Sequence, residues 1–225
     1  MTRHPHPSAP SLWAATAPPA PATPKLAESL KTDVLIVGGG FTGLSTALHL
    51  AETGCQVCVL EAHEPGWGAS GRNGGQVNPT LKHDPDELVR LYGAAKAEPL
   101  IDAVSHSADD VFDLVRRHAI DCAAVRSGWL QLAYSEKAVE GMRSRAAQWA
   151  RRGAPVETLD RAAVAKRVGT QVFAGGWLDG RAGGLQPLAY TRGLVRPLPL
   201  SGSLIRQDVG VRDRVPEPLL DERQT

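Results

Sequence analysis

The chain has 225 residues, 42% of them hydrophobic, which is enough for one large or two small domains with a buried core. Its formal net charge at pH 7 is only +1, so it has neither the basic surface of a nucleic-acid-binding protein nor a polybasic membrane anchor. The three cysteines are too few for a disulfide framework, and no apolar run is long enough to span a bilayer. We therefore expect a soluble, cytoplasmic protein without a nucleic-acid partner.

The N-terminal residues 1–30 are rich in proline and alanine. This composition does not bury enough apolar surface to fold by itself, so we expect an extended tail. Trp13 is its largest apolar side chain, and we expect this residue to dock on the folded part of the chain.

A strand, a helix and a second strand follow the tail. Residues 33–37 (DVLIV) predict a buried strand, residues 41–54 a helix closed by Gly54, and residues 56–61 (QVCVLE) a second strand. A helical crossover of this length joins parallel strands. The sequence therefore predicts a βαβ unit, after which a long loop extends from Ala62 to about Lys82.

Cys55 and Cys58 form a C-x-x-C pair at the start of the second strand. Strand side chains three residues apart point to opposite faces, whereas redox-active pairs lie at a helix N-terminus. We interpret these two residues as ordinary buried thiols.

Two helices are predicted after the loop. The first begins in HDPDELVRLYG, where Asp84 is the expected N-cap, Pro85 the first helical residue and Glu87 the partner in a capping box. The acidic cluster here fits helix capping better than a metal site. The second is an amphipathic helix at residues 99–120 that ends near His118.

The second half of the chain has mixed α+β character. Its predicted elements are a half-buried strand in 124–135, a helix in 136–153 stopped by Gly153, a short helix in 160–169 capped by Asp160, a strand with an Asp-Gly turn in 171–185, and a helix in 186–196 that begins near Pro187.

Gly38, Gly40 and Gly43 form G-x-G-x-x-G between the first strand and the helix, and Glu61 closes the next strand about 20 residues further on. The first glycine permits a tight turn, the second lets the backbone approach a pyrophosphate, and the third lets the helix pack close to the strand. The pyrophosphate then binds at the helix N-terminus. Glu61 would bind the adenosine ribose and disfavour NADP, but this motif alone does not distinguish NAD from FAD.

A second glycine cluster, GWGASGRNGGQ, spans residues 66–76. Its glycines would let the main chain pass against a flat ligand while leaving polar side chains available to it. The alternative is a flexible surface loop, which needs no tryptophan or arginine between its glycines. The interleaved residues are Trp67, Ser70, Arg72, Asn73 and Gln76.

No catalytic triad or metal-ligand spacing competes with this interpretation, and the sequence identifies no catalytic residue. The histidines share no element with ligand-type spacing and are interpreted as solvated surface residues. They are His4, His6, His49, His63, His83, His106 and His118.

The sequence resembles the D-amino-acid-oxidase-like FAD-dependent oxidoreductases, and within them the gamma-glutamylputrescine oxidase type. The likeness is carried by residues 34–54, 59–76 and 183–194, and SLWAATA at 11–17 is similar to an aromatic leader in that subgroup. It covers roughly residues 11–195, with GASGRNGGQ as its most specific part.

The resemblance implies an α/β fold in which a Rossmann-like FAD-binding βαβ domain precedes an α+β substrate domain, without the C-terminal half of the family fold. The implied divisions are a Pro/Ala-rich tail at 1–30, the first part of the FAD-binding domain at 31–122, a substrate-domain part at 123–186, the start of a return helix at 187–195, and an atypical tail at 196–225.

The resemblance also implies which residues hold the cofactor FAD. The first cluster would line the pyrophosphate, Glu61 and Ala62 would hold the adenosine, and the second cluster would follow the pyrophosphate, ribityl chain and flavin ring. Arg72 would lie near the ring or balance a phosphate. The implied cofactor residues are Gly38, Gly40, Phe41, Thr42, Gly43, Glu61, Ala62, Gly68, Ala69, Ser70, Arg72, Asn73, Gly74, Gly75 and Gln76.

The activity that the resemblance implies is oxidation of the C–N bond of an amine or amino acid, such as gamma-glutamylputrescine in putrescine catabolism. Hydride would pass to flavin N5, and molecular oxygen would reoxidise the flavin. One alternative is an inactive fragment that is at most a flavin binder or an interaction module. Another is an NAD-linked dehydrogenase, against which the second glycine cluster argues.

Residues 196–225 show no sustained helical or strand period. We expect them to be poorly ordered, and the abrupt loss of pattern suggests the hypothesis that they are out-of-frame translation. A parallel sheet that lacks strands of the family fold would then leave an open edge and uncovered apolar faces.

Overall fold

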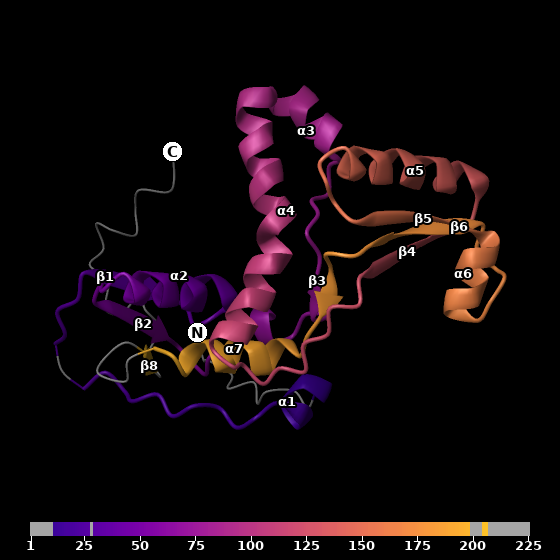
Figure 1. Cartoon of the computed structure of the whole chain (residues 1–225). Coiled ribbons are helices and arrows are strands. Elements are labelled where there is room, and N and C mark those ends of the chain that lie inside the picture. The colour runs from indigo at the N-terminus through magenta and orange to yellow at the C-terminus, as the bar shows by residue number, and fades with distance from the viewer. Residues whose placement is uncertain (1–10, 28, 199–203, 207–225) are drawn as a thin grey trace, which may run out of the picture. The chain divides into compact units, whose positions relative to one another are not determined.

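The computed structural model describes residues 11–27 and 29–198 and the strand at 204–206 (Figure 1). Two compact units divide the chain. The first consists of the described residues of Met1–Gly74, Val115–Cys122 and Gln186–Thr225, and the second of Gly75–Leu114 and Ala123–Leu185. Residues 75–114 thus fold with the second unit, although they lie within the predicted 31–122 division.

The first unit contains the βαβ unit that the sequence predicts. Its elements are α1 (Leu12–Thr16), β1 (Val34–Val37), α2 (Phe41–Glu52), β2 (Val57–Glu61), the 3₁₀ helix η1 (Ala69–Gly71), the last turn of α4 (Ala94–Arg117), α7 (Pro187–Val195) and β8 (Leu204–Arg206). The strands form a parallel sheet in the order β1-β2-β8, and α2 extends alongside β1 and β2 (Figure 1).

Strand β8 corrects the expectation that the 196–225 tail has no regular structure. It pairs in parallel with β2, with Leu204 opposite Val59 and Arg206 opposite Glu61. A three-residue strand is too short to show a period in the sequence, and pairing with a buried neighbour supplies the stability that local propensity does not. The remainder of the predicted tail from 199 onward lies outside the described residues.

Strand β1 is partly buried on one face and exposed on the other, which differs from the buried strand that DVLIV predicts. Leu35 and Val37 remain 52% and 57% exposed, and the register places them beside Cys58 and Leu60. On that face, the partly buried Leu26 packs against Cys58 and Leu60 of β2. The expectation of uncovered apolar surface on this sheet is therefore confirmed for these two side chains.

The second unit is built on an antiparallel sheet in the order β4-β6-β5 and a short β3-β7 pair. Its other elements are four helices, α4 among them up to Leu114. The bounds are β3 (Gln76–Val77), α3 (Pro85–Tyr92), β4 (Trp129–Ala133), α5 (Glu136–Ala150), β5 (Val156–Asp160), α6 (Arg161–Val168), β6 (Gly175–Asp179) and β7 (Gly183–Gly184). This confirms the mixed α+β character of the second half.

Several predicted boundaries differ in detail from the observed ones. Helix α4 begins at Ala94 and contains Pro99, because the alanine-rich residues before the proline are themselves good helix formers. Strand β5 was not predicted. Helix α3 does begin at Pro85, but the Asp84 carboxylate pairs with Arg145 rather than capping the helix.

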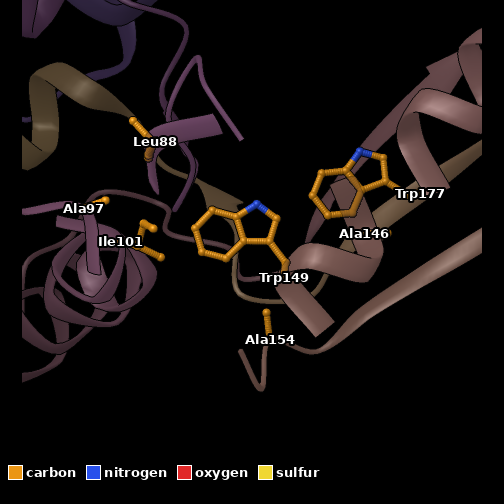
Figure 2. Close-up of a cluster of buried hydrophobic side chains, with 7 residues drawn as sticks. All are labelled: Leu88, Ala97, Ile101, Ala146, Trp149, Ala154 and Trp177. Atoms are coloured by element: carbon orange, nitrogen blue, oxygen red, sulfur yellow. The ribbon is translucent and has the colours of Figure 1, made fainter. Parts of the chain in front are cut away.

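A tryptophan-centred core holds the second unit together. Trp149 and Trp177 are 3% and 0% exposed, and Figure 2 shows Trp149 between Ile101 and Leu88 on one side and Trp177 on the other. The Arg181 guanidinium lies 4.5 Å from the Trp149 ring centroid. It also pairs with the fully buried Asp179, from Nη2 to Oδ2 at 2.6 Å and from Nε to Oδ1 at 3.0 Å.

The expectation of buried thiols in the C-x-x-C pair is confirmed for Cys58 only. Cys58 is buried, Cys55 is partly buried, and the two form no disulfide. Burial raises the pKa of the Cys58 thiol, which disfavours the reactive thiolate. Among the described helices, none combines the length and apolar composition needed to cross a lipid bilayer.

We predict that Asp179→Asn destabilises the second unit by about 3–5 kcal/mol, because it leaves the Arg181 charge buried without its partner. Urea unfolding followed by tryptophan fluorescence would measure the loss. The control is Asp160→Ala, which removes the cap that accepts a hydrogen bond from the Ala163 N–H and should cost only about 1 kcal/mol. Equal losses in the two variants would contradict the account.

Candidate cofactor site

The turn between β1 and α2 has the geometry that the first glycine motif predicts. Gly38 has a φ of +104°, a conformation that favours glycine, and its N–H donates to the Leu60 carbonyl at 2.8 Å. A Cβ atom on Gly43 would lie 2.0 Å from the Gly38 carbonyl oxygen. The first turn of α2 can therefore pack directly against the end of β1 only if residue 43 is glycine.

Glu61 connects this turn to the segment that follows β2. Its Oε2 accepts from the Gly39 N–H at 2.6 Å, and its Oε1 accepts from the His63 N–H at 3.0 Å. An ionised carboxylate has about four acceptor positions, so two protein bonds leave capacity for hydroxyl donors. The acidic residue expected to bind a ribose is thus held at the edge of the glycine turn.

Ser70 brings the second glycine cluster to the N-terminus of α2. Its hydroxyl accepts from the Phe41 N–H at 3.0 Å, and a Cβ on Gly40 would lie 2.8 Å from the same oxygen. The first N–H groups of a helix lack intrahelical acceptors and form the positive end of its dipole. A pyrophosphate fits such a place, because it accepts from helix N-terminal amides and a hydroxyl, and because residue 40 has no side chain to block its approach.

Asn73 shapes the second cluster from within. Its Nδ2 donates to the carbonyls of Ala69 and Ser70 at 3.2 and 3.0 Å, which closes the turn around η1. Its own carbonyl accepts from Trp13 Nε1 at 2.9 Å, so the predicted docking of Trp13 is confirmed. The Asn73 side-chain amide therefore supports the loop in this structure.

Arg72 stacks on an aromatic pair. Its guanidinium carbon lies 4.8 Å from the Trp67 ring centroid, and the Trp67 ring stacks on His63 at 4.1 Å between centroids. The tryptophan and the arginine of the second cluster thus contact each other within the loop. The proximity of Arg72 to a flavin or a phosphate stays a prediction.

The remaining predicted residues are divided between the two units. Gly68, Ala69, Gly74 and the Thr42 side chain are exposed in the first unit, and Ala62 is half-buried after β2. Gly75 and Gln76 belong to the second unit. There the Gly75 carbonyl accepts from the Leu185 N–H at 2.8 Å, and Gln76 pairs with Gly184 in the β3-β7 ladder.

Helix α7 contributes residues that the sequence analysis did not assign to the site. The Tyr190 and Phe41 ring centroids lie 5.5 Å apart. Burial is the main cause that raises the pKa of Tyr190 to about 12, and the nearby Cys122 is the smaller one. Gln186 caps the helix by accepting from the Ala189 N–H at 2.7 Å. The family-like segment GGLQPLAYTRGL was the signal that could have identified both.

Within the described residues, no group of three or more histidine, cysteine, aspartate or glutamate side chains could hold a metal ion. Three groups of predicted residues converge in the first unit: the Gly38–Phe41 turn, Glu61, and Ser70. They come from three separate segments of the chain.

Comparison with known proteins gives a family match over most of the chain. The model of the DAO family, described as FAD dependent oxidoreductase, matches residues 33–218. This match continues past residue 195, where the sequence analysis expected the resemblance to fade.

Curated relatives support the same family. Gamma-glutamylputrescine oxidoreductase of Escherichia coli (strain K12) is 37% identical over 181 residues, which cover 80% of this chain and 42% of the relative. The probable oxidoreductase OrdL of Rhizobium meliloti is 33% identical over 195 residues, which cover 86% of this chain and 45% of the relative. The chain therefore spans less than half the length of these relatives.

Solved structures show the same fold at lower sequence identity. Glycine oxidase from Geobacillus kaustophilus superposes with a TM-score of 0.63 at 22% identity, covering 79% of this chain and 47% of that one. L-amino acid deaminase from Proteus vulgaris gives a TM-score of 0.66 at 18% identity, with coverages of 84% and 43%.

We predict that Gly43→Ala destabilises the first unit by roughly 3 kcal/mol, because the added methyl group forces α2 away from the end of β1. The matched control is Gly68→Ala, since a Cβ there would meet nothing within 4 Å. Chemical denaturation of each purified variant measures the difference. Similar stability of the two variants would contradict the packing argument.

Proposed function

Since the chain belongs to the DAO family of FAD-dependent oxidoreductases, we propose that it binds FAD and oxidises the C–N bond of a small amine or amino acid. The observation that carries this proposal is the convergence of the Gly38–Phe41 turn, Glu61 and Ser70 at the N-terminus of α2. Glu61 and Ser70 bond the Gly39 and Phe41 amides and so lie beside the Thr42 and Gly43 amides, which have no acceptor within α2. A carboxylate, a hydroxyl and helix N-terminal amides in one place suit a dinucleotide.

Each residue in this site has a proposed role toward FAD. The glycine turn would line the pyrophosphate, and the Thr42 and Gly43 amides, which have no acceptor within α2, would donate to it. Glu61 would accept hydrogen bonds from the adenosine ribose, with Ala62 beside it. The second cluster, including Gly75 and Gln76 of the second unit, would follow the cofactor toward its flavin ring.

FAD, when bound, supplies the redox chemistry: it accepts a hydride from the substrate carbon and is reoxidised by molecular oxygen. The protein then needs only to orient the amine and to favour its neutral form. The proposed substrate is similar to gamma-glutamylputrescine, because the Escherichia coli relative carries that name. We further propose a role in putrescine catabolism and, because three cysteines are too few for a disulfide framework, a location in the cytoplasm.

Spectroscopy of the purified 225-residue chain tests this proposal. We expect added FAD to give a protein-bound absorbance band at about 450 nm that bleaches anaerobically with gamma-glutamylputrescine. If the flavin binds but no amine reduces it, the chain is a flavin binder, and the proposed oxidase activity is wrong. A colourless chain that binds NADH would overturn the proposal in favour of a dehydrogenase.

We predict that Glu61→Gln raises the dissociation constant for FAD about tenfold, because a neutral amide replaces the charged acceptor of the ribose hydroxyls. Flavin fluorescence quenching measures the constant, and an unfolding curve shows whether the variant remains folded.

The control for this prediction is Glu140→Gln, which makes the same change of charge at a side chain that is 79% exposed on α5 of the second unit. It should leave FAD affinity within about twofold of the original chain. If both variants weaken FAD binding equally, net charge rather than the position of Glu61 is responsible.

A further inference from the structure

The N-terminal segment at residues 11–18, here called the arm, is fixed to the second glycine cluster by Trp13. Its indole Nε1 donates to the Asn73 carbonyl at 2.9 Å, across 60 residues of sequence. Within the arm, Ser11 caps α1 by accepting from the Ala14 N–H at 3.1 Å. The cap places the indole on a short helical turn instead of on an extended chain.

Helix α7 holds the arm from the other side. Gln186 Nε2 donates to the Trp13 carbonyl at 2.8 Å and to the Thr16 hydroxyl at 3.2 Å. Arg192 Nη1 donates to the Pro18 carbonyl at 2.6 Å. The Arg192 side chain is only 14% exposed, so it holds this carbonyl from a largely desolvated position.

The arm is attached by directional hydrogen bonds more than by a core of its own. No residue of α1 is buried, and Leu12 is 67% exposed. A cavity of about 250 Å³, lined in part by Leu12, Trp13 and Trp67, lies between the arm and the second cluster. The hydrogen bonds of Trp13, Gln186 and Arg192 therefore fix the position of the arm.

A continuous set of hydrogen bonds leads from the arm to the proposed pyrophosphate site. Trp13 binds the Asn73 carbonyl, the Asn73 amide binds the carbonyls of Ala69 and Ser70, and the Ser70 hydroxyl accepts from the Phe41 N–H. Displacement of the arm would release one end of the 69–73 loop. The position of Ser70 at the α2 N-terminus would then no longer be fixed from that end.

We propose that the arm is a clasp that fixes the 69–73 loop against the N-terminus of α2, and that Trp13 is a positioning residue for FAD. This inference rests on the proposed function for its cofactor. Trp13 acts through Asn73 and Ser70 and does not itself contact the reacting atoms. The arm lowers the cost of ordering the loop when the cofactor binds, which is how preorganisation increases affinity.

Two substitutions in the 225-residue chain release the clasp. One removes the bond from Trp13 to the second glycine cluster, and the other removes the bond from α7 to Trp13. Trp13→Phe removes the indole donor and keeps an aromatic ring. Gln186→Glu keeps the acceptor that caps α7 but replaces the amide donor by a carboxylate facing the Trp13 carbonyl. The control is Leu12→Ala, which trims an exposed side chain on the same helix and leaves both hydrogen bonds in place.

Two measurements are made on each variant: hydrogen–deuterium exchange of the peptide that covers residues 69–73, without ligand, and the dissociation constant for FAD by fluorescence quenching. We expect faster exchange and about tenfold weaker FAD binding in Trp13→Phe and Gln186→Glu, equivalent to about 1.4 kcal/mol. Both release variants should still unfold in one cooperative transition, and Leu12→Ala should match the original chain in both measurements.

The outcomes separate the clasp from the proposed function. Unchanged exchange in both release variants overturns the clasp. Faster exchange with FAD affinity within about twofold of the original chain overturns the positioning role of Trp13. If the original chain binds no FAD, the proposed function and the positioning role fail together, while exchange still decides whether the arm orders the loop.

Discussion

The close approach of α2 to the end of β1 is the constraint on which the candidate site depends. Because residue 43 has no side chain, the first turn of α2 lies against the Gly38 carbonyl, at the same end of the sheet where β2 finishes with Glu61. This arrangement lets one carboxylate bind the Gly39 and His63 amides and one hydroxyl reach the Phe41 amide. A helix held farther from the sheet would remove both contacts.

The first unit joins segments that lie far apart in the sequence. Trp13, Asn73 and Gln186 meet through two hydrogen bonds, and Phe41 packs near Tyr190. Helix α7 therefore supports both glycine clusters. It supports the first through the Phe41–Tyr190 pair, and the second through the arm and through its own packing against Gly66 and Gly71. Dinucleotide sites of this kind depend on a scaffold as well as on a motif.

Local patterns predicted the elements well and the long-range contacts poorly. The βαβ unit, the glycine turn and the Asp160 cap follow from short-range rules on period, φ and capping. Strand β8 and the pairing of Asp84 with Arg145 did not, because each depends on a partner distant in sequence. The hydrogen bonds from the Asn73 amide to the Ala69 and Ser70 carbonyls also could not be predicted, since the sequence does not show which acceptor a side chain will select.

The central claim is that FAD binds where the two glycine clusters meet at the N-terminus of α2. Residue-resolved hydrogen–deuterium exchange of the full chain, with and without FAD, tests it most directly. FAD is expected to slow exchange of the Thr42 and Gly43 amides, because Gly39 and Phe41 already donate to Glu61 and Ser70 without it. Saturating FAD that leaves these amides unchanged and protects a different segment would contradict it.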